Sequence, residues 1–299
     1  MKQFARYNYA KGLSLKTIKW YDFNLKKFKQ FLDGQELYAA SAEQVKGYIL
    51  FLTDQGYSKD SIKGAITTLR VYYNFLMDNH IITINPTQGL TKPKSGKKII
   101  YSLTPEEMTD IMNVYAGRTD TFLNCRNGTI LSILFATGIR KSELLSIKHA
   151  DILDDFTSLK IHGKGDKERI VPISKSLRNQ LKYYLKRLLK YQNENNIKPI
   201  QNIMINVKGE PLTESGVNRI FNELKHLKRS WSTRVSAHTI RHTFALYYLR
   251  NGGDVFSLQR IMGHADLSTT KIYIELARTD LRYAMDKFCP LDNNSWQLF

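Results

Sequence analysis

The chain has 299 residues, which exceeds the usual size of one domain, and 42% of them are hydrophobic, so two domains with cores of their own are expected. No apolar run in the sequence approaches the ~20 residues of a membrane span, which excludes an integral helical membrane protein. The 45 Lys and Arg residues outnumber the 27 Asp and Glu residues and give a formal net charge of +18. This excess favours a polyanionic partner such as nucleic acid, although a generally lysine-rich proteome would produce it too.

Two features of the sequence indicate the compartment. Cys125 and Cys289 lie far apart and form no CxxC pattern, so neither a disulfide framework nor a cysteine zinc site is expected. Residues 1–6 lack the apolar stretch of a signal peptide. We therefore expect a cytoplasmic protein in a reducing environment.

Residues 1–90 have the pattern of a helical bundle. Ser41 and Gln44 give a capping-box pattern before a helix that ends at Gly56, and Ser58 begins the next helix. Four helices in about 80 residues make a compact bundle. The sequence therefore predicts a first, all-helical domain.

The first apolar stripe of this domain covers residues 15–32, with Ser14 as a candidate N-cap. Apolar side chains at helical spacing predict one buried face. Its expected members are Leu15, Ile18, Leu25, Phe28 and Leu32, and Asp22 alone interrupts them.

Residues 91–101 are expected to form a linker, because proline, glycine and serine break regular structure here. Its lysines favour a segment that lies along a phosphate backbone if the chain binds DNA. A solvated linker is the alternative. The lysines are Lys92, Lys94, Lys97 and Lys98.

Residues 102–299 are expected to form a second domain, which begins at the N-cap Thr104 followed by Pro105. A change to alternating apolar residues predicts a β-hairpin within residues 157–173, and a further short strand is expected at residues 202–206. Gly138 is expected to end a helix in the left-handed conformation. The expected helices cover residues 127–136, 141–147, 181–191, 214–226, 237–251, 254–262 and 269–287.

Six side chains of the second domain suit an attack on a phosphodiester. Two guanidinium groups can neutralise phosphate oxygens, an ammonium and two imidazoles can move protons, and a phenol can be the nucleophile that holds the phosphate covalently. Fixed cations can stabilise the developing charge, so this chemistry needs no metal and no nucleotide cofactor. The six residues are Arg140, Lys164, His238, Arg241, His264 and Tyr273.

The local motif around Arg241 has more than one interpretation. His238 and Arg241 share a helix face, and a cap at Ser236 would leave a helix N-terminus that suits an anion. A zinc site at His238 and His242 is the alternative, but Thr239 stands where the metalloprotease motif has glutamate, and Arg241 would repel a metal. His242 itself fits a structural role in the core.

In this order and at these spacings, the six residues resemble the active-site set of the tyrosine recombinase family of site-specific DNA recombinases, the integrase, Xer and Cre group. The resemblance covers nearly the whole chain. It implies a mainly α fold with a small antiparallel β-sheet, in which a helical-bundle, SAM-like core-binding domain precedes a tyrosine-recombinase catalytic domain. Ile240 and Met262 stand where the family often has leucine.

The resemblance also implies how the phosphate is handled. Arg140 and Arg241 would clamp the scissile phosphate, and His264 would hydrogen-bond it. Glu143 matches an acidic residue of the family that supports the site.

Three more roles follow from the same resemblance. Tyr273 would form a 3′-phosphotyrosyl link, Lys164 would protonate the leaving 5′ oxygen, and His238 would assist proton transfer. The partner is then double-stranded DNA with inverted-repeat core sites. A C-terminal oligomerisation tail, at about residues 276–299, would dock into a neighbouring protomer and link four subunits on DNA. The alternative is a tail that covers its own domain.

The sequence therefore predicts a DNA strand-exchange enzyme that works through a Holliday junction. A type IB topoisomerase, or a non-catalytic DNA-binding regulator on the same scaffold, would be the alternatives. The helical domain begins near Met1, which favours an Xer-like or resolvase role over an integrase with an additional arm-site domain. Dimer resolution, integration or excision, and the need for an accessory protein or a second recombinase stay open.

Overall fold

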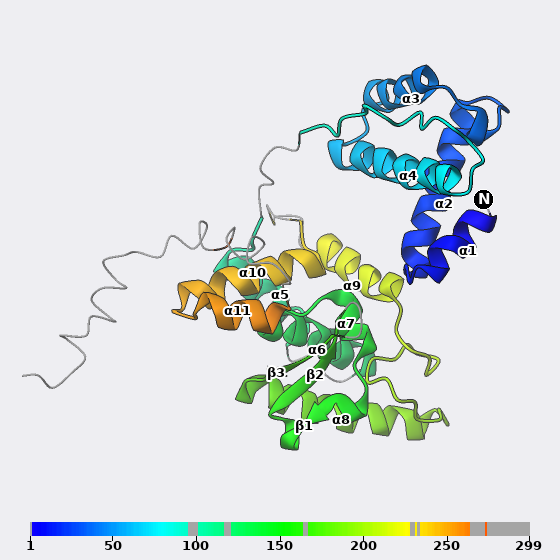
Figure 1. Ribbon diagram of the computed structural model, residues 1–299. Coiled ribbons are helices and arrows are strands. Elements are labelled where there is room, and N and C mark those ends of the chain that lie inside the picture. Colours follow the sequence, from blue (N-terminus) through cyan, green and yellow to red (C-terminus); the bar gives the residue numbers. More distant parts are fainter. Residues whose placement is uncertain are drawn as a thin grey trace, which may run out of the picture. The chain divides into compact units, whose positions relative to one another are not determined.

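The computed structural model describes residues 2–94, 101–116, 121–163, 167–227, 231, 234–263 and 273. Within these residues the protein is mainly α-helical with one small antiparallel sheet (Figure 1), which confirms the predicted fold class. The chain divides into two compact units, Met1–Ile99 and Ile100–Phe299. No helix in the described part of either unit is long and apolar enough to cross a bilayer.

The described residues of the first unit form four α-helices and a short 3₁₀ turn. The side chains of Ser14, Ser41 and Ser58 each accept a hydrogen bond from a backbone N–H one turn into their helix, so the predicted caps are confirmed. The elements are α1 (Lys2–Ala10), α2 (Leu15–Phe31), η1 (Leu37–Ala39), α3 (Ala42–Asp54) and α4 (Lys59–Asp78).

The buried face of α2 is the expected one except at its first residue, Leu15. Tyr21, Leu25 and Phe28 are buried, whereas Leu15 is 64% exposed. A helix turns by ~100° per residue, so Leu15 lies on the side of Asp22 and about 120° away from Tyr21. The inclusion of Leu15 in the stripe was therefore wrong, because the buried side of α2 is the one that carries Tyr21, Leu25 and Phe28.

The second unit carries nearly all the predicted helices, with bounds shifted by a few residues. Its helices are α5 (Pro105–Asn113), α6 (Phe122–Thr137), α7 (Lys141–Ser146), α8 (Lys175–Glu194), α9 (Glu214–Leu227), α10 (Ala237–Arg250) and α11 (Val255–Met262). Its other elements are η2 (His149–Asp151), β1 (Ile152–Leu153), η3 (Asp154–Phe156), β2 (Ser158–His162) and β3 (Glu168–Pro172). Of the helix expected over residues 269–287, only Tyr273 belongs to the described residues.

The predicted hairpin is confirmed as β2 and β3, which pair antiparallel with Leu159 opposite Val171. β1 adds a two-residue third strand that has too few residues to show an alternation. The strand expected at residues 202–206 was a wrong prediction, because this segment makes only isolated bridges. Ile203, Met204 and Ile205 are all fully buried, so the apolar run fills the core instead of alternating across a sheet.

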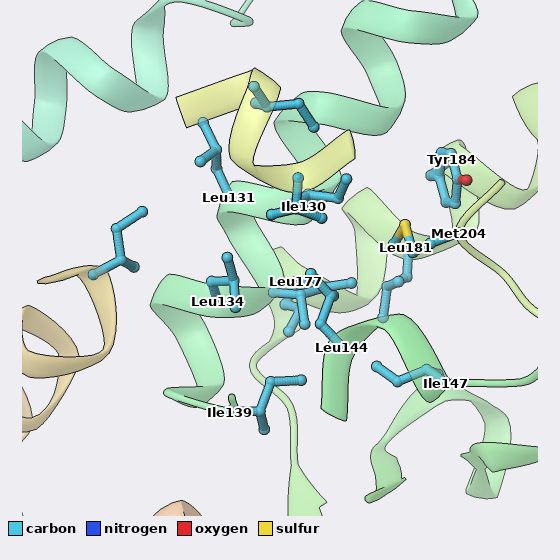
Figure 2. Packing of buried hydrophobic residues seen from close by; sticks show 14 of the residues in the cluster. Ile130, Leu131, Leu134, Ile139, Leu144, Ile147, Leu177, Leu181, Tyr184 and Met204 are labelled. Carbon is cyan, nitrogen blue, oxygen red and sulfur yellow. The ribbon is translucent and has the colours of Figure 1, made fainter. Parts of the chain in front are cut away.

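The core of the second unit is built around α6, which packs against α8 and α10. Ile130, Leu131 and Leu134 are fully buried, and Figure 2 shows them close to Leu177 of α8 and Leu144 of α7. Most residues of α6 are buried or half-buried, which is typical of a central helix with packing partners around it. This central position makes the C-terminal end of α6 a fixed platform for the residues that follow it.

Gly138 ends α6 in the predicted left-handed conformation, with φ of 59°. A Cβ atom at this position would lie 2.2 Å from Phe244 of α10, so both the backbone angle and the packing require glycine. The turn at Gly138 places Arg140 immediately before α7, at the N-terminal end of that helix.

Candidate active site

Arg241 is the buried cation of the candidate site. It lies on α10, which begins after Ser236, whose hydroxyl accepts a hydrogen bond from the Thr239 N–H. Only 4% of Arg241 is exposed, and its guanidinium donates to the carbonyl oxygens of Gly138 at 2.5 Å and Met262 at 2.8 Å. Burial, together with the nearby Arg140, lowers the pKa of Arg241 to about 10, so it is a cation at neutral pH.

Arg140, which immediately precedes α7, approaches one of the carbonyl groups that Arg241 contacts, that of Met262. Its Nη1 donates to Met262 O at 3.5 Å and to Glu143 Oε1 at 2.8 Å, and its Nη2 donates to Gly263 O at 3.2 Å. Its side chain is 44% exposed, in contrast to that of Arg241. The two arginines that the sequence analysis selected are therefore brought together at the end of α11.

Glu143 is the anion that joins these cations. Its carboxylate is 4% exposed and accepts hydrogen bonds from the backbone and side chain of Arg140 and from both terminal nitrogens of Arg169, at 2.8 to 3.1 Å. Burial raises the pKa of the Glu143 carboxyl, but the hydrogen bonds and charge of Arg169 and Arg140 outweigh it and hold that pKa below its usual range. Glu143 therefore links Arg140 and Arg169 through one buried carboxylate.

Arg169 is a residue that the sequence analysis missed. It lies on β3, and besides the bidentate contact to Glu143 its Nε donates to Ile261 O at 2.8 Å. One signal could have revealed it. Arg169 is two residues before the buried Val171, so the alternation of β3 points its side chain inward, while Ile170 is 63% exposed. A charged residue at an inward strand position needs a partner.

The C-terminal end of α11 gathers all three arginines. The carbonyl oxygens of Ile261, Met262 and Gly263 accept from Arg169, from Arg140 and Arg241, and from Arg140, respectively. Carbonyl groups in the last turn of a helix lack partners within the helix, and the helix dipole makes this end negative. In Figure 1, α11 lies beside α10 and reaches β3, which agrees with this convergence.

Tyr273 is buried, with 2% of its surface exposed, in a cluster with side chains of α10 and α11. Its hydroxyl lies 2.5 Å from Nδ1 of His242, and the two ring centroids are 5.5 Å apart. Burial raises the pKa of Tyr273, and the charge of Arg241 acts in the opposite direction. The candidate nucleophile thus lies close to the buried arginine.

His242 was interpreted as a core residue, and that interpretation missed its contact with Tyr273. Its ring also packs edge-on against His238, with centroids 4.2 Å apart. Burial, and then the neighbouring His238 and Arg241, lower the pKa of His242 to about 4, so its imidazole is neutral at pH 7. His238, by contrast, is exposed at the start of α10.

Some predicted site residues lie outside the described residues, namely Lys164, His264, Lys97 and Lys98. Lys92 and Lys94 are described and exposed. Within the described part of the chain, no group of three or more His, Cys, Asp or Glu side chains could hold a metal ion. The arrangement in the described residues is therefore a cluster of guanidinium groups next to a phenol and two imidazoles.

Replacing Glu143 by glutamine is expected to lower the free energy of unfolding by about 2–3 kcal/mol. This is less than the ~3–5 kcal/mol for breaking a fully buried pair, because Arg140 is partly exposed and the amide keeps an acceptor. The folded-state pKa of Glu143 is depressed, so its contribution is present above the unfolded value of ~4.3 and is lost as pH falls further. Urea unfolding at several pH values should show the two proteins converging below about pH 4.

Glu194→Gln is the matched control, because Glu194 forms an exposed pair with Lys190 on α8. We expect a change below ~0.5 kcal/mol for this variant. Equal losses of unfolding free energy in the two variants would mean that the Glu143 cluster contributes no more to stability than an exposed ion pair.

Comparisons with known proteins show the family of the chain. Residues 101–279 match the model of the phage integrase family, and residues 1–80 match the phage integrase N-terminal SAM-like domain. Tyrosine recombinase XerC of Staphylococcus haemolyticus is 33% identical over 280 residues, which cover 91% of this chain and 90% of that protein. Tyrosine recombinase XerD of Halalkalibacterium halodurans is 32% identical over 301 residues, with 97% of both chains covered.

A solved structure shares the fold. The XerH site-specific recombinase, in a post-cleavage complex with its palindromic difH substrate, superposes with a TM-score of 0.70 at 24% identity, covering 93% of this chain and 81% of that one. The sequence matches extend over both units, and the resemblance stated from the site residues is confirmed by them. The chain belongs to the phage integrase family and is a tyrosine recombinase.

Proposed function

We propose that Tyr273 is the nucleophile of this site-specific recombinase and that it cuts DNA through a 3′-phosphotyrosyl intermediate. The observation that carries the proposal is the position of the phenol. Its oxygen is held by His242, which directly follows Arg241 on α10, and Arg241 shares a carbonyl acceptor with Arg140. A nucleophile next to two fixed guanidinium groups is the arrangement that an attack on a phosphodiester needs.

In the proposed reaction the Tyr273 oxygen attacks phosphorus, and the bond from phosphorus to the 5′ oxygen breaks. Arg140 and Arg241 neutralise the charge on the non-bridging oxygens, and His264 donates a hydrogen bond to them. Lys164 gives a proton to the leaving 5′ oxygen, and His238 assists proton transfer. A 5′-hydroxyl of the partner duplex then reverses the attack, and two such rounds exchange the strands through a Holliday junction.

DNA binding outside the site is assigned to the basic linker and the overall charge. The formal net charge of +18 supports long-range attraction to a polyanion, and Lys92 and Lys94 are exposed in the linker. Together with Lys97 and Lys98 they would contact the phosphate backbone. We propose inverted-repeat core sites in double-stranded DNA as the target, and the cytoplasm as the compartment.

We also propose a homotetramer on DNA, joined by the C-terminal tail of about residues 276–299. Two observations support it. Tyr273 is 2% exposed, so assembly on DNA must open a path for the phosphate to its hydroxyl while the hydroxyl stays next to His242. A cavity of about 480 Å³, lined by aromatic side chains of α6 and α10, adjoins the cluster that holds Tyr273 and offers space for an apolar segment of a neighbouring protomer. Its lining includes Phe135, Phe244, Tyr247 and Tyr248.

Covalent capture on a nicked duplex tests this function. The full-length protein first selects binding sites from a random-sequence duplex library, and a selected duplex is then made with a nick that lets the cleaved 5′ fragment diffuse away. We expect a protein–DNA adduct that survives denaturation, with DNA on the peptide that contains Tyr273. We also expect joining to a second duplex that carries the same site.

The other outcomes separate the alternatives. Tight binding to the selected duplex without an adduct would contradict the proposal and indicate a regulator. An adduct that relaxes supercoiled plasmid but never joins a second duplex would indicate a topoisomerase. An adduct on another tyrosine would show that the strand-exchange chemistry is right and the assignment of Tyr273 is wrong.

A further inference from the structure

We infer that His242 is a further catalytic residue, which takes the proton from the Tyr273 hydroxyl as the phenol oxygen attacks phosphorus. The inference rests on the proposed role of Tyr273 as the nucleophile. It gives a function to a side chain whose sequence position indicated a place in the core. The role proposed above for Lys164 stays unchanged, and His238, whose ring packs edge-on against that of His242, assists the same transfer of the phenol proton.

The contact geometry is that of a nucleophile and its base. His242 Nδ1 and Tyr273 Oη are 2.5 Å apart, within direct hydrogen-bond reach, so no water needs to lie between them. The two residues are 31 positions apart in the chain, so the contact is not a consequence of local helix geometry. Tyr273 is packed in the apolar cluster around α10, which holds the ring in place.

The side chains around His242 keep its imidazole ready to accept. Burial, His238 and Arg241 lower its pKa to about 4, so the ring is neutral at physiological pH. A neutral imidazole has one donor and one acceptor nitrogen, and the phenol donates to Nδ1 when the ring proton is on Nε2. A cationic imidazole would have no acceptor for the phenol proton.

Without DNA, the imidazole of His242 is too weak a base to remove the proton from the Tyr273 phenol, whose pKa is raised. The nucleophile therefore stays protonated and inactive. A bound phosphodiester places a negative charge beside Arg241, which opposes the effect of the cations and raises the pKa of His242. The phenol becomes a much stronger acid as its oxygen bonds to phosphorus. Proton transfer is therefore favourable in the transition state, where general-base catalysis contributes.

The step balances without another reactant. The Tyr273 oxygen forms its bond to phosphorus and releases its proton to His242 Nδ1, which becomes an imidazolium. The bond to the 5′ oxygen breaks, and that oxygen takes a proton from the general acid on the leaving-group side. In the reverse reaction the imidazolium returns the proton to the phenol oxygen as the phosphotyrosyl bond breaks.

A pair of His242 variants separates proton transfer from positioning. Asparagine places an amide near the position of Nδ1, so His242→Asn keeps a hydrogen-bond acceptor for Tyr273 but cannot take a proton. His242→Ala removes both properties. His226→Asn is the matched control, because His226 is exposed in the last turn of α9.

The capture rate is measured on a selected nicked duplex with either a normal 5′ oxygen or a bridging 5′ sulfur at the scissile bond. A thiolate leaves without a proton, so the sulfur substrate removes the need for a general acid. We expect both His242 variants to lose about 10²- to 10⁴-fold in rate on both substrates. Lys164→Ala should lose rate on the oxygen substrate and recover on sulfur, and added imidazole should restore part of the His242→Ala rate.

Two results would overturn the inference. A wild-type rate for His242→Asn would mean that the histidine only positions the phenol. Recovery of the His242 variants on the sulfur substrate would place His242 on the leaving-group side. The role of Tyr273 is tested separately in the same assay, since an adduct formed by Tyr273→Phe would contradict the nucleophile itself, whatever the His242 variants do.

Discussion

Replacing Tyr273 by phenylalanine is expected to reduce covalent capture of a nicked duplex by about 10⁴-fold or more, because the only atom removed is the attacking oxygen. Binding to the same duplex should be unchanged. The ring keeps its packing in the apolar cluster of α10 and α11, and the lost hydrogen bond to His242 is worth about 1 kcal/mol of stability. Denaturing gels measure the adduct, and mobility shifts measure the binding.

Tyr184→Phe is the control for this substitution. Tyr184 is a fully buried tyrosine of α8 whose hydroxyl donates to Ile203 O, so the same atom and one hydrogen bond are lost. We expect it to capture DNA at the wild-type rate. Equal loss in both variants would show that the loss of a buried hydroxyl, and not of the attacking oxygen of Tyr273, limits the reaction.

Arg241→Lys is expected to lower the capture rate by about 10²- to 10³-fold, although it keeps a positive charge. The guanidinium of Arg241 reaches two carbonyl oxygens on different segments, Gly138 O before α7 and Met262 O at the end of α11. A single ammonium cannot make these planar contacts and still face a phosphate. In other enzymes, removing one preorganised hydrogen-bond donor that stabilises the transition-state charge lowers the rate by about 10²- to 10³-fold.

The same variant should be less stable by about 1–3 kcal/mol, because a buried carbonyl group loses its partner. Urea unfolding measures this loss, and single-turnover capture at saturating protein measures the rate. Arg250→Lys is the control, since Arg250 is exposed in the last turn of the same helix. A wild-type rate for Arg241→Lys would mean that charge alone, without the bidentate geometry, serves the reaction.

Sequence and structure agree best where a feature depends on near neighbours in the chain. The caps at Ser41 and Thr104 each involve a residue three positions on, and both capping boxes are present. Gly138 ends its helix as predicted, because only glycine adopts that backbone angle without strain. The hairpin of β2 and β3 follows from alternation and a turn.

They disagree where burial depends on distant parts of the chain. The fully buried run at residues 203–205 has the composition of a strand, but its neighbours in space are helices and not paired strands. Leu15 has the character of a core residue, yet it lies on the exposed side of α2. Apolar composition predicts that a segment is buried somewhere, and the packing partners decide which of its sides is covered.

The sequence by itself determined the family, because the combination of six residue types in order, from Arg140 to Tyr273, resembles its active-site set without any coordinates. Only the tertiary structure decided which further side chains meet them. Arg169 reaches Glu143 across 26 residues, and His242 reaches Tyr273 across 31. Local hydrogen bonds follow from residues a few positions apart, whereas these contacts form only after β3, α10 and α11 have packed around one core.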